Sequence, residues 1–236
     1  MQEPLFCFQI KEFNPASISN AYEVFHLCTS KPLNFGVTKI YAACDMDTDG
    51  GGWMVIMKRT NGDVNFNRTL EDYEFGFGNL NGEFWYGLKN IHCLTDREPV
   101  ELRIEIGNGT VPSIVWVYQT FHVASEPFYT LQIGNGVGEG DTNDAMSSHN
   151  GKHFYTYDRD EGFCARDHGA GWWYFRTNNK NCHTANLNGP YYDQATSNLG
   201  DVLSWNSTAG YVHYTHVSMK VRPKVCTPCK EFMLDI

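Results

Sequence analysis

The sequence has 236 residues, of which 42% are hydrophobic, 19% are charged and 14% are aromatic; this composition is typical of a folded domain and excludes a disordered chain. The formal net charge is −9, and lysine and arginine form no basic stripe, which argues against nucleic-acid binding. No stretch approaches the roughly 20 apolar residues that a membrane-spanning helix requires, so membrane insertion is not expected.

Strand patterns dominate the first part of the chain. Around residue 103 charged and apolar side chains alternate, as expected for a half-exposed strand. A triple-glycine turn at 50–52 separates two further strand candidates. The predicted strands cover residues 36–44, 53–58, 100–106, 114–123 and 129–133, and short helical segments are predicted at 70–73 and 83–90.

The chain becomes irregular after residue 134. From there to about residue 210, polar turns alternate with aromatic residues and no period persists. A long irregular stretch is usually either disordered or functional, and the aromatic residues and two cysteines here indicate order. Strand character returns at 211–222. We therefore predict an α+β domain with a central, mainly antiparallel sheet, short helices and a loop-rich C-terminal binding region at 135–210.

Eight widely spaced cysteines favour a disulfide framework formed in an oxidising compartment. The Cys226–Cys229 CxxC motif follows Arg222-Pro223, whereas redox pairs normally open a helix after a strand, so a structural bridge is the favoured interpretation. Three N-glycosylation sequons agree with a secreted or extracellular protein, and they begin at Asn67, Asn108 and Asn206.

Two acidic segments are candidate calcium loops. Residues 45–50 imitate the start of an EF-hand loop, but its twelfth position is Ile56 rather than a carboxylate, so solvated turn residues explain the acids better. Asp158, Asp160 and Glu161 place carboxylates in one short turn, which suits a hard cation such as calcium. A solvated acidic turn is an equal alternative for this second segment.

No enzyme motif is present in the sequence: HExxH, GxSxG, P-loop and Rossmann fingerprints are all absent. The pairs Asp167-His168 and Cys182-His183 are adjacent in sequence and seldom face one point, so they form no ready nucleophile and base. Trp172-Trp173 must bury a large apolar area in a small core, which is compatible with a pocket wall next to it. We expect the two tryptophans to form the wall of a shallow, polar-rimmed pocket. We predict a protein that is not an enzyme.

Several motifs in one order give the sequence a resemblance to a known family. They are Cys44-Asp45-Met46 with Gly50-Gly51-Gly52-Trp53, Glu83 to Leu88, Glu101-Leu102-Arg103, Asp144-Ala145-Met146 with His149-Asn150-Gly151, Trp172 to Gly189, and Met219 to Pro223. Together they resemble the fibrinogen C-terminal domain family, which includes ficolins, tachylectins, tenascins and angiopoietins. The resemblance covers nearly the whole chain.

The resemblance implies disulfides Cys7–Cys44 and Cys164–Cys182, and a cis peptide at Asn181–Cys182. It also implies a calcium site beside a ligand pocket; Asp158 and Asp160 are the candidate ligands, and a shortened loop predicts weak affinity. The pocket of lectin-like members takes acetylated groups. The corresponding residues here are His168, Asn181, Cys182, His183, Leu199 and Tyr211.

A third bridge, Cys28–Cys93, is predicted because both cysteines stand where relatives usually have none; Cys226 and Cys229 would then pair with each other. We expect a fibrinogen C-terminal-like domain at 5–223 and a C-terminal extension at 224–236. The predicted function is extracellular recognition of acetylated or anionic glycans, and the alternative is a protein-binding adhesion or receptor-ligand module of the tenascin or angiopoietin type. Oligomers would form through a parent chain.

Overall fold

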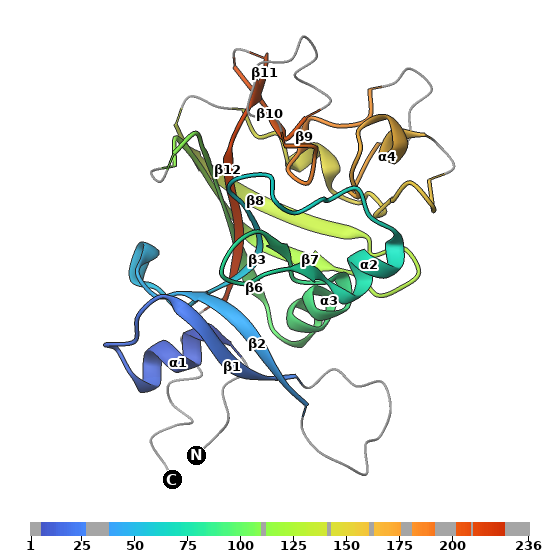
Figure 1. Cartoon of the computed structure of the whole chain (residues 1–236). Helices are drawn as coiled ribbons and strands as arrows, with labels where there is room; N and C mark the ends of the chain where they lie inside the picture. Colours follow the sequence, from blue (N-terminus) through green and yellow to red (C-terminus); the bar gives the residue numbers. More distant parts are fainter. Residues whose placement is uncertain are drawn as a thin grey trace.

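The protein is described by a computed structural model (Figure 1). The described residues are 6–26, 38–109, 112–140, 143–160, 163–175, 181–191, 202–208 and 210–224. Leu199, Cys28, Cys226, Cys229 and most of the predicted C-terminal extension therefore lie outside the described residues.

One large antiparallel sheet forms the centre of the molecule (Figure 1). Its main path runs β1-β2-β3-β12-β6-β7-β8, and two short strands, β4 and β5, extend it beside β3. The last strand of the chain thus lies between β3 and β6. The bounds are β1 Asn20–His26, β2 Thr38–Asp45, β3 Trp53–Arg59, β4 Phe77–Gly78, β5 Phe84–Trp85, β6 Val100–Gly107, β7 Ile114–Val123, β8 Leu131–Glu139 and β12 His216–Pro223.

The alternation predicted for residues 100–106 is present in β6. Leu102, Ile104 and Ile106 are fully buried on one face, whereas Glu101 and Arg103 lie on the other face and are half-buried. Successive side chains of a strand point to opposite faces, so a period of two separates core from surface. The predicted α+β class with a mainly antiparallel sheet is confirmed.

Helices are few and short: α1 Cys7–Phe13, α2 Leu70–Phe75, α3 Leu88–Arg97 and α4 Cys164–Asp167, with 3-10 turns η1 Thr48–Gly50 and η2 Ser147–His149. Thr69 caps α2 by accepting a hydrogen bond from the Asp72 N–H at 3.2 Å. The helix predicted for 83–90 begins later than expected. Phe84 pairs with β3, and Gly87 has a φ of 101°, so helical geometry starts only at Leu88. In the described residues no helix is both long and apolar enough to cross a bilayer.

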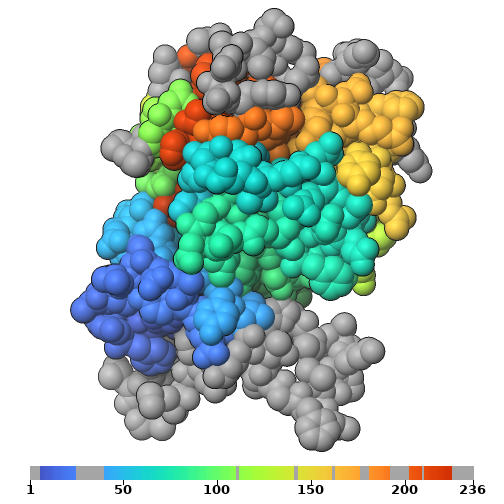
Figure 2. Space-filling view, in the orientation of Figure 1, coloured from blue at the N-terminus to red at the C-terminus, as the bar shows by residue number. Residues whose placement is uncertain are grey.

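A second, three-stranded sheet stands at one end of the molecule. Its strands are β9 Ala185–Asn186, β10 Ser204–Ser207 and β11 Gly210–His213, in the order β11-β10-β9. Figure 2 shows the same end in gold, orange and red, where described segments between residues 143 and 213 gather away from the blue N-terminal segments. The predicted binding region therefore lies mainly at this end.

Candidate ligand-binding site

The Cys164–Cys182 disulfide joins α4 to the segment that leads into β9. Its sulfurs are 2.09 Å apart, and the bridge closes a sequence separation of 18 residues. The second predicted bridge, Cys7–Cys44, is also present, with a separation of 37 residues. Cys93 is disulfide-bonded as well. Because Cys28 is not described, the Cys28–Cys93 pairing stays a prediction, as does Cys226–Cys229.

Three of the predicted site residues form one cluster beside the Cys164–Cys182 bridge. The Nε2 atom of His183 lies 3.4 Å from Nδ1 of His168, and the ring centroids are 4.5 Å apart in an edge-to-face arrangement. The Tyr211 hydroxyl donates to the His183 carbonyl, and its ring lies 5.6 Å from the His183 ring. His183 is buried, whereas His168 and Tyr211 are half-buried. A ligand would therefore meet His168 and Tyr211 first, with His183 behind them.

Tyr174 closes the inner side of this cluster. Its ring lies 5.9 Å from His168 and 6.0 Å from His183, and its hydroxyl donates to Asn186 Oδ1 at 3.2 Å. The amide of Asn186 in turn donates to the His168 carbonyl at 3.4 Å. Burial raises the pKa of Tyr174 well above its ordinary value, so the hydroxyl stays a donor. Tyr174 and Asn186 thus hold the backbone and rings of the site in place.

His149 supports the strand that follows His183. Its Nδ1 donates to the Trp173 carbonyl at 2.7 Å, so its Nε2 is free to accept, and it does so from the Thr184 and Ala185 N–H groups at 3.3 and 3.1 Å. The side chain is fully buried, which lowers its pKa to about 4 and keeps the ring neutral. Sequence reasoning noted His149 only as part of a motif and missed this supporting role.

Two expectations about the pocket need correction. Trp172 and Trp173 are both fully buried, and Trp173 packs 5.1 Å from Phe154 with its Nε1 donating to the Tyr129 carbonyl at 2.8 Å. Their large apolar surface belongs in the core, and Tyr174 takes the place predicted for them. Among the described residues the cis peptide is Glu126–Pro127, so Asn181–Cys182 is trans.

Of the remaining predicted pocket residues, Asn181 and Cys182 lie at the same bridge, and Leu199 is outside the described residues. Asn181 is exposed, and Cys182 is buried in its disulfide. The Cys182 carbonyl accepts from the Phe175 N–H at 2.7 Å.

Among the sequon asparagines, Asn67 and Asn108 are exposed, whereas Asn206 is half-buried in β10 opposite Tyr211. Glycosylation at these positions stays a prediction.

Asp158 and Asp160, the predicted calcium ligands, accept hydrogen bonds from the first turns of two helices. Asp158 Oδ1 accepts from the Leu70 N–H at 3.0 Å, and Asp160 Oδ2 accepts from the Ala165 N–H at 2.5 Å. In the part of the chain that the structure describes, neither carboxylate belongs to a cluster of three or more possible metal ligands. Calcium needs six to eight oxygen ligands. These contacts are typical of helix capping. Glu161 lies outside the described residues, and calcium binding by this loop stays a prediction.

Calcium titration checks this interpretation. We expect a Kd no tighter than about 10⁻⁴ M by calorimetry, because the shortened loop lacks one of the carboxylate ligands that relatives usually have. Asp160→Asn should lower the free energy of unfolding by about 1 kcal/mol through its capping bond, whether or not calcium is present. The exposed Asp63→Asn is the control. Submicromolar calcium binding that Asp160→Asn abolishes would contradict this account.

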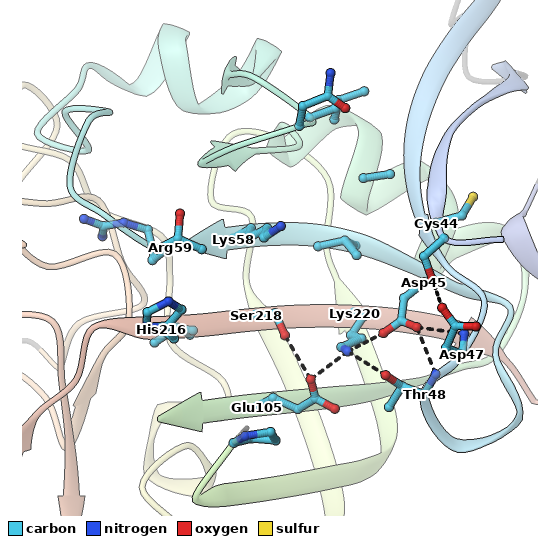
Figure 3. A pocket seen from close by; sticks show the side chains of 18 of the residues that line it. Cys44, Asp45, Asp47, Thr48, Lys58, Arg59, Glu105, His216, Ser218 and Lys220 are labelled. Atoms are coloured by element: carbon cyan, nitrogen blue, oxygen red, sulfur yellow. Dashed lines mark hydrogen bonds and ion pairs between the residues drawn. The ribbon is translucent and has the colours of Figure 1, made fainter. Parts of the chain in front are cut away.

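A groove of about 670 Å³ crosses the central sheet away from the histidine cluster (Figure 3). Lys220 lies at its floor, 2.6 Å from Asp45 Oδ2 and 2.7 Å from Glu105 Oε2. Burial raises the pKa of Asp45, but the hydrogen bond and charge of Lys220 outweigh this and hold that pKa well below its usual range. The Lys220 ammonium and the two carboxylates therefore form ion pairs with one another. Asp45, the first residue of the segment that imitates an EF-hand loop, is thus paired with Lys220.

A disulfide-linked domain with a histidine and tyrosine cluster at its loop-rich end is typical of a binding module. Residues 9–224 match the family described as "Fibrinogen beta and gamma chains, C-terminal globular domain". The chain belongs to this fibrinogen C-terminal domain family, as its sequence motifs predicted. The family consists generally of binding modules and not of enzymes.

Relatives come from proteins of several kinds. Tenascin-R of Mus musculus is 37% identical over 218 residues, which is 90% of this chain and 15% of tenascin-R. Techylectin-5A of Tachypleus tridentatus is 36% identical over 81% of this chain and 65% of that protein. The chain thus spans only a small part of tenascin-R and just under two thirds of Techylectin-5A.

Solved structures show the same fold. The fibrinogen-like globe domain of human ANGPTL2 has a TM-score of 0.79 at 33% identity, covering 93% of this chain and 99% of that domain. Lamprey fibrin D-dimer, complexed with the peptide ligand Gly-His-Arg-Pro-amide, has a TM-score of 0.76 at 27% identity, covering 93% of this chain and 73% of the matched chain.

Proposed function

We propose that this chain is an extracellular, lectin-like recognition module that binds acetylated or anionic glycans at the cluster of His168, His183 and Tyr211. The observation that carries the proposal is the packing of these three side chains against one another at the loop end of the domain. The two disulfides support an extracellular location, because such bridges persist in oxidising compartments.

The chemistry of the cluster suits an acetyl group. The half-buried rings of His168 and Tyr211 offer an apolar surface for a methyl group or a sugar face. Imidazole nitrogens supply hydrogen-bond donors for a carbonyl or carboxylate oxygen. Tyr174, Asn186 and the Cys164–Cys182 bridge fix the arrangement before a ligand arrives. Such preorganisation lowers the entropy lost on binding.

Protein recognition is the second candidate. Phe163, next to the Cys164–Cys182 bridge, leaves 59% of its surface exposed, and the Arg166 guanidinium lies 5.4 Å from its ring centre. Exposed aromatic and arginine side chains are enriched at protein interfaces. The similarity to tenascin-R and to a fibrin that binds a peptide also supports this alternative.

A glycan array with matched variants tests the proposal. His168→Ala should weaken binding of N-acetylated glycans about tenfold, because it removes a contact worth roughly 1–1.5 kcal/mol. His168 is half-buried, which makes this variant a gentler test than replacing the buried His183. His153→Gln, a histidine outside the cluster, is the control and should bind like the wild type.

The array also separates the two candidate functions. If glycans bind with equal affinity to wild type and His168→Ala, the site lies elsewhere on the domain. If no glycan binds, but an extracellular protein ligand binds and Phe163→Ser weakens it, the protein-recognition alternative replaces the proposal.

A further inference from the structure

A cluster of two histidines and one aspartate lies on the seam between α3 and β7. His92 and Asp96 are four residues apart in α3, so they share one face of that helix, and His122 faces them from β7. One ligand atom from each residue lies within 4.8 Å of the others. His122 Nε2 is 3.6 Å from Asp96 Oδ1. A helix and a strand therefore bring three potential metal ligands together.

His92 is held in the orientation that metal binding needs. Its Nδ1 lies 2.8 Å from the Val123 carbonyl, and because a carbonyl can only accept, Nδ1 carries the hydrogen. In the neutral ring Nε2 is then left as a bare lone pair, available to a metal. A backbone carbonyl on the second nitrogen is the outer partner that metal-binding histidines usually have.

Hydrogen bonds join the two sides of the seam. Val123 N–H donates to Thr95 Oγ1 at 3.1 Å, and the same hydroxyl donates to the His92 carbonyl at 3.1 Å. These bonds tie α3 to β7 through Val123, which follows His122, and through the His92 carbonyl itself. The rings of His92 and His122 meet edge to face, with centroids 6.2 Å apart. Asp96 is exposed and can adjust to an incoming ion, which gives the ion an entry path.

We propose that His92, Asp96 and His122 form a zinc-binding site. Two imidazoles and a carboxylate suit Zn²⁺, at ligand distances of about 2.0–2.2 Å, and water would complete a tetrahedron. Calcium and magnesium prefer oxygen ligands and are disfavoured. The site is separate from the histidine cluster at the loop end, since α3 and α4 lie apart in Figure 1. It does not depend on the proposed glycan recognition.

Calorimetric titration of the full chain with ZnCl₂ in calcium-free buffer tests the site. We expect one zinc ion per chain, and His92→Gln and His122→Gln should each weaken its binding at least about tenfold, since even outer partners of metal ligands contribute about 10- to 100-fold. His153→Gln serves as the matched histidine control. Equal zinc affinity in wild type and in both variants would overturn the proposal, as would the absence of binding.

A second measurement decides the question if either variant fails to fold. Titrating the wild-type chain with Co²⁺ should give the intense visible absorption of tetrahedral cobalt, and Zn²⁺ should displace it. A weak, octahedral-type spectrum without nitrogen ligation would overturn the proposal. Thermal unfolding of wild type with zinc should also occur at a higher temperature than with EDTA, because a ligand that binds the native state stabilises it.

Discussion

Replacing Glu83 by glutamine is expected to lower the free energy of unfolding by about 3–5 kcal/mol. The Glu83 side chain is fully buried and lies 3.7 Å from the Arg59 guanidinium, which is also buried. Its Oε1 accepts from the N–H groups of Thr60, Asn61 and Gly62, and its Oε2 accepts from Val64. A glutamine amide would turn one acceptor into a donor facing these donors and would leave Arg59 without its counter-charge.

Urea unfolding measures the loss, and Glu71→Gln on the exposed face of α2 is the control, with an expected change below about 0.5 kcal/mol. Burial raises the pKa of Glu83, but the backbone N–H bonds outweigh it and lower that pKa. The stabilisation by Glu83 is therefore present above the pKa of an unfolded glutamate, about 4.3, and is lost as the pH falls through the lower folded value. If Glu83→Gln lowers the free energy of unfolding no more than Glu71→Gln does, the result contradicts this account of the turn.

The second large effect is expected for Lys220→Met, which removes the cation between Asp45 and Glu105 (Figure 3). Two half-buried carboxylates would then lie on the floor of the groove without the buried ammonium between them, and Glu105 would keep only the Arg103 guanidinium at 2.6 Å. Breaking such a buried pair costs about 3–5 kcal/mol at neutral pH. Lys58→Met is the control, because Lys58 precedes Arg59 on β3 and lines the same groove from a half-buried position.

The pH dependence of Lys220→Met distinguishes lost charge pairing from lost packing. In the wild type burial opposes ionisation of Asp45 and Glu105, but Lys220 outweighs it and lowers both pKa values. Their stabilisation is present above about pH 4 and disappears as the pH falls through the folded values. Without Lys220 the carboxylates protonate more easily, so the difference between variant and wild type should shrink below pH 4. A difference that stays constant with pH would indicate packing instead.

The sequence predicted the sheet where residue patterns are local. The alternation in β6 identifies that strand because one face of it is buried. The apolar run of β3 identifies that strand because nearly all of its side chains are buried. Strand β1 went unpredicted because it pairs only with β2 and buries Val24 alone among the described side chains on its length. The strands β9, β10 and β11 are two to four residues long, too short for a period to appear.

The candidate site was less accessible to sequence reasoning. Family resemblance, and not spacing, pointed to His183 and Tyr211, which are 28 residues apart and meet only in the folded chain. His149 acts through backbone N–H groups 35 and 36 residues away, and no local pattern signals such a contact. The zinc-site residues were also missed, because His122 joins His92 and Asp96 only when β7 packs against α3.

Histidine NMR during titration with N-acetylglucosamine tests the proposed recognition site most directly. The NMR signals of the nine histidines distinguish regions of the domain. His168 and His183 lie in the loop cluster, His216 lines the sheet groove, and His92 lies at the α3–β7 seam. The proposal predicts that the side-chain ¹⁵N and ¹H signals of His168 and His183 shift with ligand concentration while those of His216 and His92 stay in place. Shifts confined to His216, with His168 and His183 unchanged, would contradict it and place the ligand in the groove.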